Sequence, residues 1–348
     1  MPWRAVFGFR GAFQVLQRTL MRLATTLVTL FGVAVIVFVV IRVVPGDPIA
    51  MMLPPMATPE DIQRLKALYG LDKSIAEQFF IWLGGVLHGD FGTSITMRQP
   101  VLGLVLGRLP ATLELSVMAL VIAVIWGGAL ALAGTRWRGS KAEAAIDVGN
   151  GMALSVPDFL WGLVLILFFG VLWPVFHISG RVSPSLELPF TTNFYLFESV
   201  LRLRFDLWAD IVSHMFMPAL ALAFPLAAII AQLLKQSLKE TMHLDYVTLS
   251  RTKGYGENHV ITREALPNAI LPTLTLVGVQ FTFLIGGTVI IERLFSYEGL
   301  GNMAIDAVIN RDLPLIQGIV ILFAVIFTGV NLIVDLLYTV LNPRLRHA

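Results

Sequence analysis

The sequence contains no cysteine among its 348 residues. This absence excludes disulfide frameworks, thiolate metal sites and cysteine nucleophiles. Charge is also scarce, because Asp, Glu, Lys and Arg make up only 14% of the chain and the formal net charge is +2. So small a positive excess gives no reason to expect a nucleic-acid partner. No cleavable signal peptide is apparent, since the first apolar run is long enough to span a membrane rather than be removed.

Apolar side chains are abundant instead. They make up 56% of the residues, and the mean hydropathy is +0.78, far from the balance of a soluble domain. A helix needs about 20 residues to cross the roughly 30 Å hydrocarbon layer, and lipid offers no partner for unpaired backbone groups. The sequence therefore predicts an all-α membrane protein with six transmembrane helices. The six charge-free runs are Leu23–Ile41, Ser116–Gly134, Phe159–Phe176, Ile211–Leu234, Ala265–Ile291 and Leu313–Val334.

The distribution of Lys and Arg predicts the orientation. One side would hold both termini together with the second and fourth connections. That side carries 14 of the 25 Lys and Arg residues but only 7 of the 23 Asp and Glu residues. Both termini are therefore predicted to be cytoplasmic. An odd number of spans, the alternative, would divide this asymmetry between the two faces.

Two stretches outside the apolar runs have an organisation of their own. Met1–Gln17 carries aromatic residues among arginines, which suits a short helix at the membrane surface, although a frayed tail is an equal alternative. Val44–Leu109 forms a long external segment. Within it, Thr58 is expected to cap a helix that begins at Pro59 and ends at Gly70.

The most informative stretch is Asp245–Pro272, a short polar and basic passage between two apolar runs. Asp245 is expected to cap a helix that runs through Lys253, and Gly254 is placed to end it. Arg251 and Lys253 lie in its last turn, where positive charge complements the helix dipole. A structured hairpin on the cytoplasmic side indicates a docking surface.

One face of this predicted helix has the character of a contact surface. Tyr246, Leu249 and Lys253 recur at helical spacing and form a single stripe that could enter a groove on a partner. An amphipathic helix resting on the bilayer is the alternative.

Other classes of function find little support. A secondary transporter or channel needs ionisable groups inside the membrane, and the six runs contain no Asp, Glu, Lys or Arg. An intramembrane enzyme needs paired Asp residues, an H-E-x-x-H motif or Ser with His. We therefore expect no catalytic, cofactor-binding or metal residues, and the chain also lacks a G-x-x-x-x-G-K-[ST] phosphate loop. None of the histidines has metal-ligand spacing; they are His88, His177, His214, His243, His259 and His347.

Ten short motifs occur along the chain in an order and spacing that are specific in combination. They are VPGDP (44–48), YGLDKSIAEQF (69–79), HGDFGTS (88–94), RLPATLEL (108–115), SVPDFLWG (155–162), DYVTLSRTKG (245–254), EALPNAILP (264–272), FSYEGLG (295–301), RDLPLIQG (311–318) and VDLLYTVLNPRLR (334–346). Through them the chain resembles, along nearly its whole length, the B-type permease subunits of dipeptide and oligopeptide ABC importers.

This resemblance implies a type I ABC importer in the inner membrane. Its implied partners are a homologous second permease, two ABC ATPase subunits and a periplasmic substrate-binding protein, with ATP hydrolysed by the ATPases. The chain would form half of the translocation pathway for short peptides. Related permeases are also associated with nickel complexes, haem, glutathione and sugars, which stay open as alternatives, and the substrate-binding residues are not identified.

The resemblance also implies a division of the chain. Residues 1–22 would be a cytoplasmic or interfacial segment, 23–43 the first transmembrane helix and 44–109 a periplasmic subregion. Residues 110–342 would form the transmembrane permease domain with a coupling loop at 236–264, and 343–348 a cytoplasmic tail.

The coupling loop of such permeases has the general pattern E-A-A, three residues, Gly, nine residues and I-x-L-P. Counting from Gly254 places the triplet at Thr248, Leu249 and Ser250, which departs from E-A-A. The resemblance implies that the residues contacting the ATPase are Asp245, Tyr246, Thr248, Leu249, Ser250, Arg251, Lys253, Gly254, Leu266 and Pro267.

Overall fold

The computed structural model describes residues 21, 24–40, 58, 60 and 73–341. Within this part the chain is helical, with a single isolated β-bridge and no strand, so the all-α prediction is confirmed. The predictions for Met1–Gln17, for the helix from Pro59 to Gly70 and for the tail at 343–348 lie outside the described residues.

Four stretches of helix are long and apolar enough to cross a membrane by length and composition. They are α5 (Val101–Arg136), α9 (Phe205–Thr241), the stretch Glu257–Leu294 and the part Leu313–Val334 of α14 (Leu313–Leu341). A bent pair of helices raises the number to five among the described residues. The first predicted span corresponds to a shorter apolar helix, Ala24–Val40, so six spans are compatible with the structure.

The bent pair is the main departure from the predicted spans. α6 (Lys141–Ser155) meets α7 (Asp158–Leu165) at an angle of 104°, and α7 continues as a π-helix, η1 (Ile166–Leu172). Pro157 lies at the break, and the residue before it, Val156, is extended at φ −102° and ψ 124°. Proline forces this because it lacks an N–H group and disfavours a helical conformation in the residue before it. The helix that corresponds to the predicted third span, Phe159–Phe176, is α7 with η1, and it ends at Leu172.

The helices are also longer than the charge-free runs from which they were predicted. α5 begins before Ser116 and includes Glu114, and the stretch Glu257–Leu294 includes Glu292. Both carboxylates are buried, with Glu292 fully inaccessible. The expectation that the spans carry no acidic residue thus holds for their apolar centres but not for their ends.

The chain divides into two compact units. Unit 1 comprises residues 1–107 and 303–329, and unit 2 comprises 108–302 and 330–348. In unit 1, α4 (Ile75–Leu87) begins at a capping box, in which the Ser74 hydroxyl accepts the Glu77 N–H and the Glu77 carboxylate accepts the Ser74 N–H. Two aromatic rings, Phe38 and Phe79, pack edge to face at 5.1 Å.

A buried aspartate joins two of the motifs inside unit 1. Asp312 of the RDLPLIQG motif accepts hydrogen bonds from the Ser94 hydroxyl and from the Thr96 N–H at 3.0 Å. Its second oxygen accepts the Leu315 N–H at 3.3 Å. Because Asp312 is fully buried, these donors supply the partners that a buried carboxylate needs.

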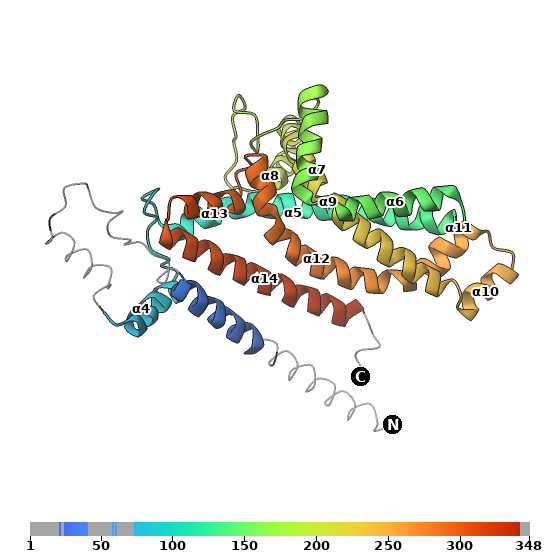
Figure 1. Ribbon diagram of the computed structural model, residues 1–348, viewed down its shortest axis with the longest axis horizontal. Coiled ribbons are helices and arrows are strands. Elements are labelled where there is room, and N and C mark those ends of the chain that lie inside the picture. The colour runs from blue at the N-terminus through green and yellow to red at the C-terminus, as the bar shows by residue number, and fades with distance from the viewer. Residues whose placement is uncertain (1–20, 22–23, 41–57, 59, 61–72, 342–348) are drawn as a thin grey trace, which may run out of the picture. The chain divides into compact units, whose positions relative to one another are not determined.

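Unit 2 is built around α9. Four helices pack against it, namely α6, α7, α8 (Tyr195–Leu201) and α12 (Leu266–Leu294) (Figure 1). In its most apolar stretch α9 has 72% of the residues buried, against 28% for Glu257–Leu294. α5 approaches α9 closely at Gly127, where an added Cβ would lie 2.5 Å from the Ala227 carbonyl oxygen. Outer helices such as α12 therefore leave apolar faces for lipid or a partner to cover.

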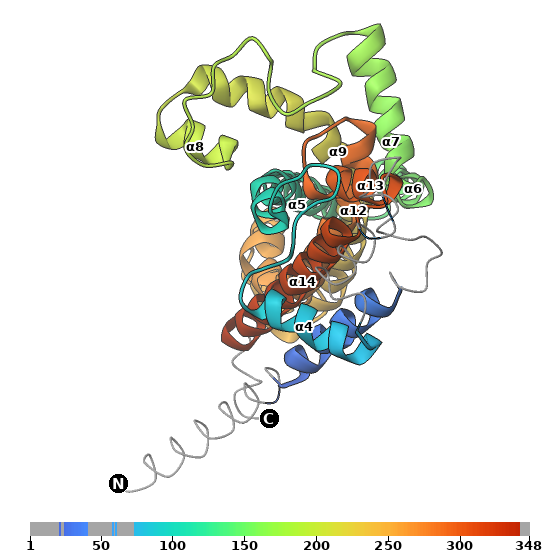
Figure 2. The ribbon, with the colours of Figure 1, turned by 90° about the vertical axis from the view of Figure 1, so that its left-hand side faces the viewer.

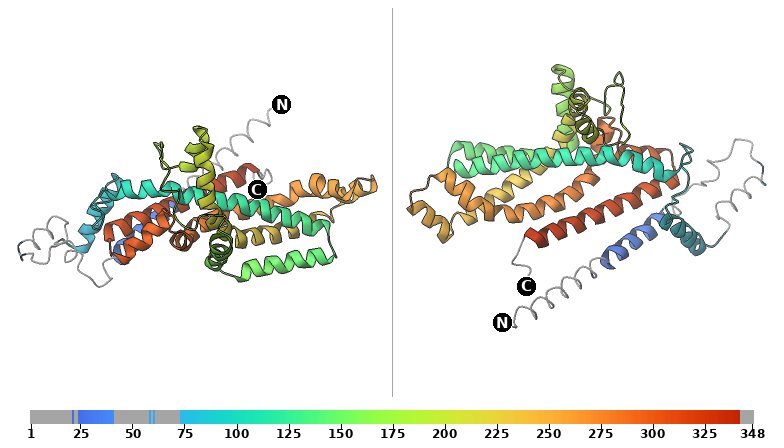
Figure 3. Two further views of the ribbon diagram at one scale, coloured as in Figure 1. Left: turned by 90° about the horizontal axis from the view of Figure 1, so that it is seen from above. Right: turned by 180° about the vertical axis from the view of Figure 1, so that it is seen from behind.

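The two ends of α9 carry different structures. A 37-residue helix is about 55 Å long. At its start lies the connection 173–204, whose helix α8 packs against α9 (Figure 2). At its finish lies α10 (Asp245–Thr252), which forms an end of unit 2 in both views of Figure 3.

Candidate functional site

α10 begins differently from the prediction. Leu244, not Asp245, occupies the N-cap position, with an extended backbone at φ −74° and ψ 148° and no side-chain cap. The prediction that Asp245 caps the helix is therefore wrong. Asp245 instead lies in the first turn, where its negative charge is favoured by the positive end of the helix dipole.

The end of α10 confirms the role predicted for Gly254. Its φ is +84°, and its N–H donates to the Arg251 carbonyl at 2.9 Å. This left-handed conformation costs little for glycine but is unfavourable for residues with a Cβ. The helix ends at Thr252 rather than running through Lys253, which takes the C-cap position.

The inner face of α10 is anchored in a small apolar core. Val247 is completely buried, and Ser250 one turn later is also buried. Val247 packs in a cluster with Leu238 of α9 and with Val260 of the π-helix η2 (Val260–Ala265). Burying an aliphatic side chain of this size contributes about 1.5–3 kcal/mol. The inner face of α10 is therefore in direct contact with α9 and η2.

The outer face of α10 carries the predicted stripe. Tyr246 is 38% exposed, Leu249 is 54% exposed, and Lys253 is exposed. The predicted triplet divides between the two faces, because Thr248 and Leu249 are exposed whereas Ser250 is buried. The stripe therefore lies at the surface of unit 2.

Polar contacts hold α10 against the start of α12. The Tyr246 hydroxyl accepts a hydrogen bond from the Asn268 side-chain amide at 2.7 Å. Asn268 directly follows Leu266 and Pro267, so the fold brings the second part of the predicted site beside α10. The Arg251 guanidinium pairs with Glu257 at 2.8 Å, and both side chains stay exposed, at 41% and 42%.

Polar contacts at the same end of unit 2 join four other helices in two pairs. The Lys235 ammonium of α9 binds two carboxylates of α6, those of Glu143 at 2.7 Å and Asp147 at 2.8 Å. The Arg136 Nε at the end of α5 donates to the Asn258 side-chain oxygen of α11 (Glu257–His259) at 2.7 Å. These contacts join α9 to α6 and α5 to α11 beside α10.

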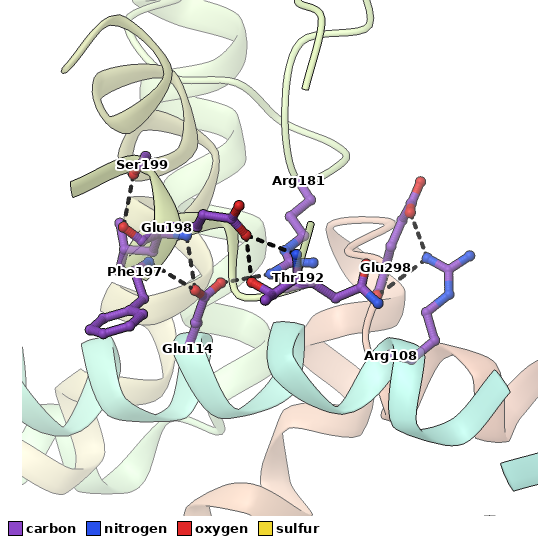
Figure 4. Close-up of polar contacts among 10 residues, drawn as sticks. Arg108, Glu114, Arg181, Thr192, Phe197, Glu198, Ser199 and Glu298 are labelled. Atoms are coloured by element: carbon purple, nitrogen blue, oxygen red, sulfur yellow. Dashed lines mark hydrogen bonds and ion pairs between the residues drawn. The ribbon is translucent and has the colours of Figure 1, made fainter. Parts of the chain in front are cut away.

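A buried ion pair organises the opposite end of unit 2 (Figure 4). Arg181 of the 173–204 connection binds Glu114 of α5 at 2.6 Å, and the two side chains are only 5% and 7% exposed. Glu114 also accepts the backbone N–H groups of Leu196 at 2.9 Å and Phe197 at 3.3 Å. The Arg181 guanidinium lies 3.9 Å from the ring centre of Tyr195, a cation–π contact.

A second carboxylate shapes the same connection. Glu198 of α8 accepts hydrogen bonds from the hydroxyl and backbone N–H of Thr192 and from those of Thr191, at 2.6–3.2 Å. Hydrogen bonds, that of the Thr192 hydroxyl first among them, lower the pKa of Glu198 to about 2. Charge-assisted bonds of this kind fold the connection onto the start of α8.

Two further motifs meet beside this network. Thr112 donates its hydroxyl hydrogen to Glu292 at 2.7 Å and accepts the Leu300 N–H at 2.8 Å. Tyr297, between them in the FSYEGLG motif, is fully buried, and burial raises the pKa of its phenol well above the usual range. These contacts give RLPATLEL and FSYEGLG a structural role in joining α5 to the end of α12.

The structure also gathers three side chains that the sequence did not connect. One ligand atom from each of His177, Asp210 and His214 lies within 4.8 Å of the other two. Sequence spacing indicated no metal-ligand set, since His177 and His214 lie far apart in the chain. The four-residue spacing of Asp210 and His214 on one helix face was the available signal. Similarly, nothing in the sequence paired Arg181 with Glu114.

Comparison with known proteins agrees with this architecture. Residues 119–347 match the family model for the binding-protein-dependent transport system inner membrane component, and residues 15–116 match the N-terminal model of such membrane components. The dipeptide transport system permease protein DppB of Escherichia coli K12 is 37% identical over 340 residues, covering 96% of this chain and 99% of DppB.

Two other relatives are similar over stretches almost as long. The di/tripeptide transport system permease protein DppB of Pseudomonas aeruginosa UCBPP-PA14 is 35% identical, covering 94% of this chain and 97% of its own length. The glutathione transport system permease protein GsiC of E. coli K12 is 32% identical, covering 96% of this chain and all of its own length. The chain therefore belongs to the family of binding-protein-dependent transport system inner membrane components.

Proposed function

We propose that this permease subunit receives energy from a separate ABC ATPase through the outer face of α10. The observation that carries the proposal is the pairing of an exposed stripe with a buried anchor on one short helix. Tyr246, Leu249 and Lys253 face outward, while Val247 is locked into the core beside α9 and η2. An amphipathic helix with an exposed stripe suits a groove on a partner.

The contacts around α10 support a rigid-body mechanism. When the ATPases close, they push on α10, and its inner face passes the displacement to α9 and through η2 to α12. π-Helical segments such as η2 occur often at functional sites, and switching between packed arrangements is a common form of gating. The resulting tilt of these spans would exchange inward for outward access of the pathway.

The leucine at the centre of the stripe gives the direct test. Leu249→Arg should abolish co-purification of the ATPase subunits with the permease, because it places a charge on the surface that enters the groove. The matched control is Leu201→Arg, which alters a similarly exposed leucine of α8 at the other end of α9. Retention of the ATPases by Leu249→Arg, or their loss from both variants, would contradict the proposal.

Gly254 offers a test of transmission rather than of docking. Gly254→Val forces a β-branched residue into a left-handed conformation, which costs roughly 1–2 kcal/mol and shifts the end of α10. The variant should remain in the membrane at normal levels while uptake by the complete system is lost. Unimpaired uptake would show that the geometry of this turn does not matter.

We further propose that the substrate is a short peptide and that this chain forms half of the translocation pathway. A homologous permease would form the other half, and a periplasmic binding protein would deliver the peptide. The names of the two DppB relatives, a dipeptide and a di/tripeptide permease, support a peptide substrate. Because GsiC is named for the transport of glutathione, a thiol tripeptide is the second candidate substrate. Dipeptides should compete with a labelled dipeptide for uptake; competition by glutathione alone would favour the second candidate.

The proposed orientation places α10 in the cytoplasm and α8 in the periplasm. Because the chain has no cysteine, single-cysteine variants can report each face without background. A membrane-impermeant maleimide should label Leu201→Cys in intact spheroplasts but label Thr252→Cys only after permeabilisation. Both positions are exposed at the protein surface. The opposite pattern of labelling would reverse the orientation.

A further inference from the structure

The cluster of His177, Asp210 and His214 lies at the start of α9, far from α10, and the coupling role does not use it. Asp210 and His214 lie one turn apart on α9, and His177 belongs to the 173–204 connection. We propose that these three residues bind a divalent transition-metal ion of the Zn²⁺ type. This inference is independent of which solute the permease transports.

The chemistry of the donor set matches such an ion. Two imidazole nitrogens and one carboxylate oxygen form a common set of three protein ligands for Zn²⁺, with a fourth position left for water or another ligand. Imidazole also selects against Mg²⁺ and Ca²⁺, which prefer oxygen ligands only. A transition metal is therefore the class of ion that this set recognises.

Contacts behind two of the three residues, Asp210 and His214, orient them as metal ligands usually are oriented. The two Asp210 carboxylate oxygens accept the Ser183 hydroxyl at 2.6 Å and the Ser183 N–H at 2.8 Å. His214 Nδ1 lies 2.8 Å from the Asp210 carbonyl oxygen, which can only accept, so Nδ1 carries the proton and Nε2 keeps a lone pair. Histidine ligands characteristically donate their other N–H group in this way.

Loading the site requires one local change. The His177 and His214 rings are stacked with their centres 4.0 Å apart and their planes within 5°, so their lone pairs do not yet converge. Bonds of about 2.1 Å in a tetrahedral zinc site place ligand atoms about 3.4 Å apart. His214 is only 4% exposed, whereas His177 is exposed and therefore able to turn. The ion would then fasten the connection to α9.

The alternative is a stacked pair of neutral histidines with no ligand. A matched control separates the two cases. His243 also directs Nδ1 at the carbonyl oxygen four residues earlier, that of Lys239, at 2.6 Å. Yet in the part of the chain that the structure describes, His243 joins no cluster of ligating side chains.

The experiment uses the full chain, purified in detergent with a tag that contains no histidine and stripped with a chelator. Co²⁺ is titrated while its visible d–d absorption is followed, Zn²⁺ is used to displace it, and bound metal per chain is measured by mass spectrometry. The wild type and His243→Ala should each bind one ion. His177→Ala and Asp210→Asn should weaken binding at least about 100-fold, and Ser183→Ala about tenfold.

Two results would overturn the inference. One is a wild-type chain that binds no more Co²⁺ or Zn²⁺ per chain than a double variant that carries both His243→Ala and His177→Ala. The other is unchanged affinity in both His177→Ala and Asp210→Asn, which would mean that the metal binds elsewhere. His177 is exposed, so its replacement leaves the core intact, and a normal elution profile on size exclusion confirms that the variant is folded.

Discussion

Replacement of Arg181 by methionine removes the cation of the ion pair that joins the 173–204 connection to α5. Arg181→Met preserves much of the side chain's length while leaving Glu114 buried without its charged partner. Glu114 keeps only the N–H groups of Leu196 and Phe197. Arg181 also loses its contact with Tyr195. The perturbation thus tests whether a buried carboxylate in this position depends on the arginine.

The magnitude follows from the burial of the pair. Breaking a buried ion pair by removing one partner typically costs about 3–5 kcal/mol, because an uncompensated charge is left inside. For a cooperative unit of about 150–250 residues, each kcal/mol lowers the melting temperature by about 2–4 °C. Arg181→Met should therefore lower the midpoint by about 6–20 °C. An exposed pair offers the comparison: Arg108 and Glu298 are 42% and 62% exposed, and surface pairs contribute about 0–1 kcal/mol.

The assay is thermal unfolding of the purified chain in detergent at one heating rate, since membrane proteins often unfold irreversibly. Arg181→Met, Glu114→Gln and the double variant form a thermodynamic cycle that isolates the pair from the tyrosine contact. The double variant should regain most of the melting temperature that Arg181→Met loses, because it also removes the unpaired buried carboxylate of Glu114. A double variant no more stable than Arg181→Met, or an equal loss from Arg108→Met, would refute the reasoning.

Two further predictions concern single groups in unit 2. Gly127→Ala places a Cβ 2.5 Å from the Ala227 carbonyl oxygen and should destabilise the chain by about 1–3 kcal/mol in the same thermal assay. In the control, Gly128→Ala, the added Cβ meets nothing within 4 Å, so this variant should be neutral or stabilised by up to about 1 kcal/mol. Equal effects of the two substitutions would contradict the close approach of α5 and α9. Thr192→Val removes the hydroxyl donor to Glu198 and should raise its pKa. Because that pKa is lowered from 4.5 to about 2 by folding, its stabilising effect is present above pH 4.5 and is lost as the pH falls towards 2. A pH series of melting temperatures should show the variant losing this contribution at higher pH than the wild type, and superimposable profiles would show that the hydroxyl does not control the titration.

The apolar runs predicted the helices well but not their limits. Hydropathy identifies the segment that lipid must cover, and it stops at the first charge. The folded helices continue past that point, as α5 does to Glu114, because Arg181 from a distant segment satisfies the carboxylate. The 104° break at Pro157 was visible in the sequence as a proline, but its angle depends on how α6 and α7 each pack against α9.

In the α10 region, too, some features could be predicted from the sequence and others could not. Gly254 was identified from its place after a helical stripe, and its positive φ confirms that assignment. Asp245 was assigned as the cap because its side chain is a good acceptor, yet the turn after α9 places Leu244 there. The sequence also gave no means to see that Ser250 turns inward while Leu249 next to it faces out.

Composition and periodicity alone determined that this chain is an all-helical membrane protein with a polar, glycine-terminated helix between two apolar spans, because each of those properties depends on neighbours within a few residues. Tertiary structure decided which distant groups meet: Arg181 with Glu114, Asp312 with Ser94, and His177 with His214. Such pairs are separated by many residues, and no local rule of spacing fixes them. They form because packing around α9 within unit 2, or within unit 1 in the case of Asp312, brings distant segments together, and the buried carboxylates among these groups need partners.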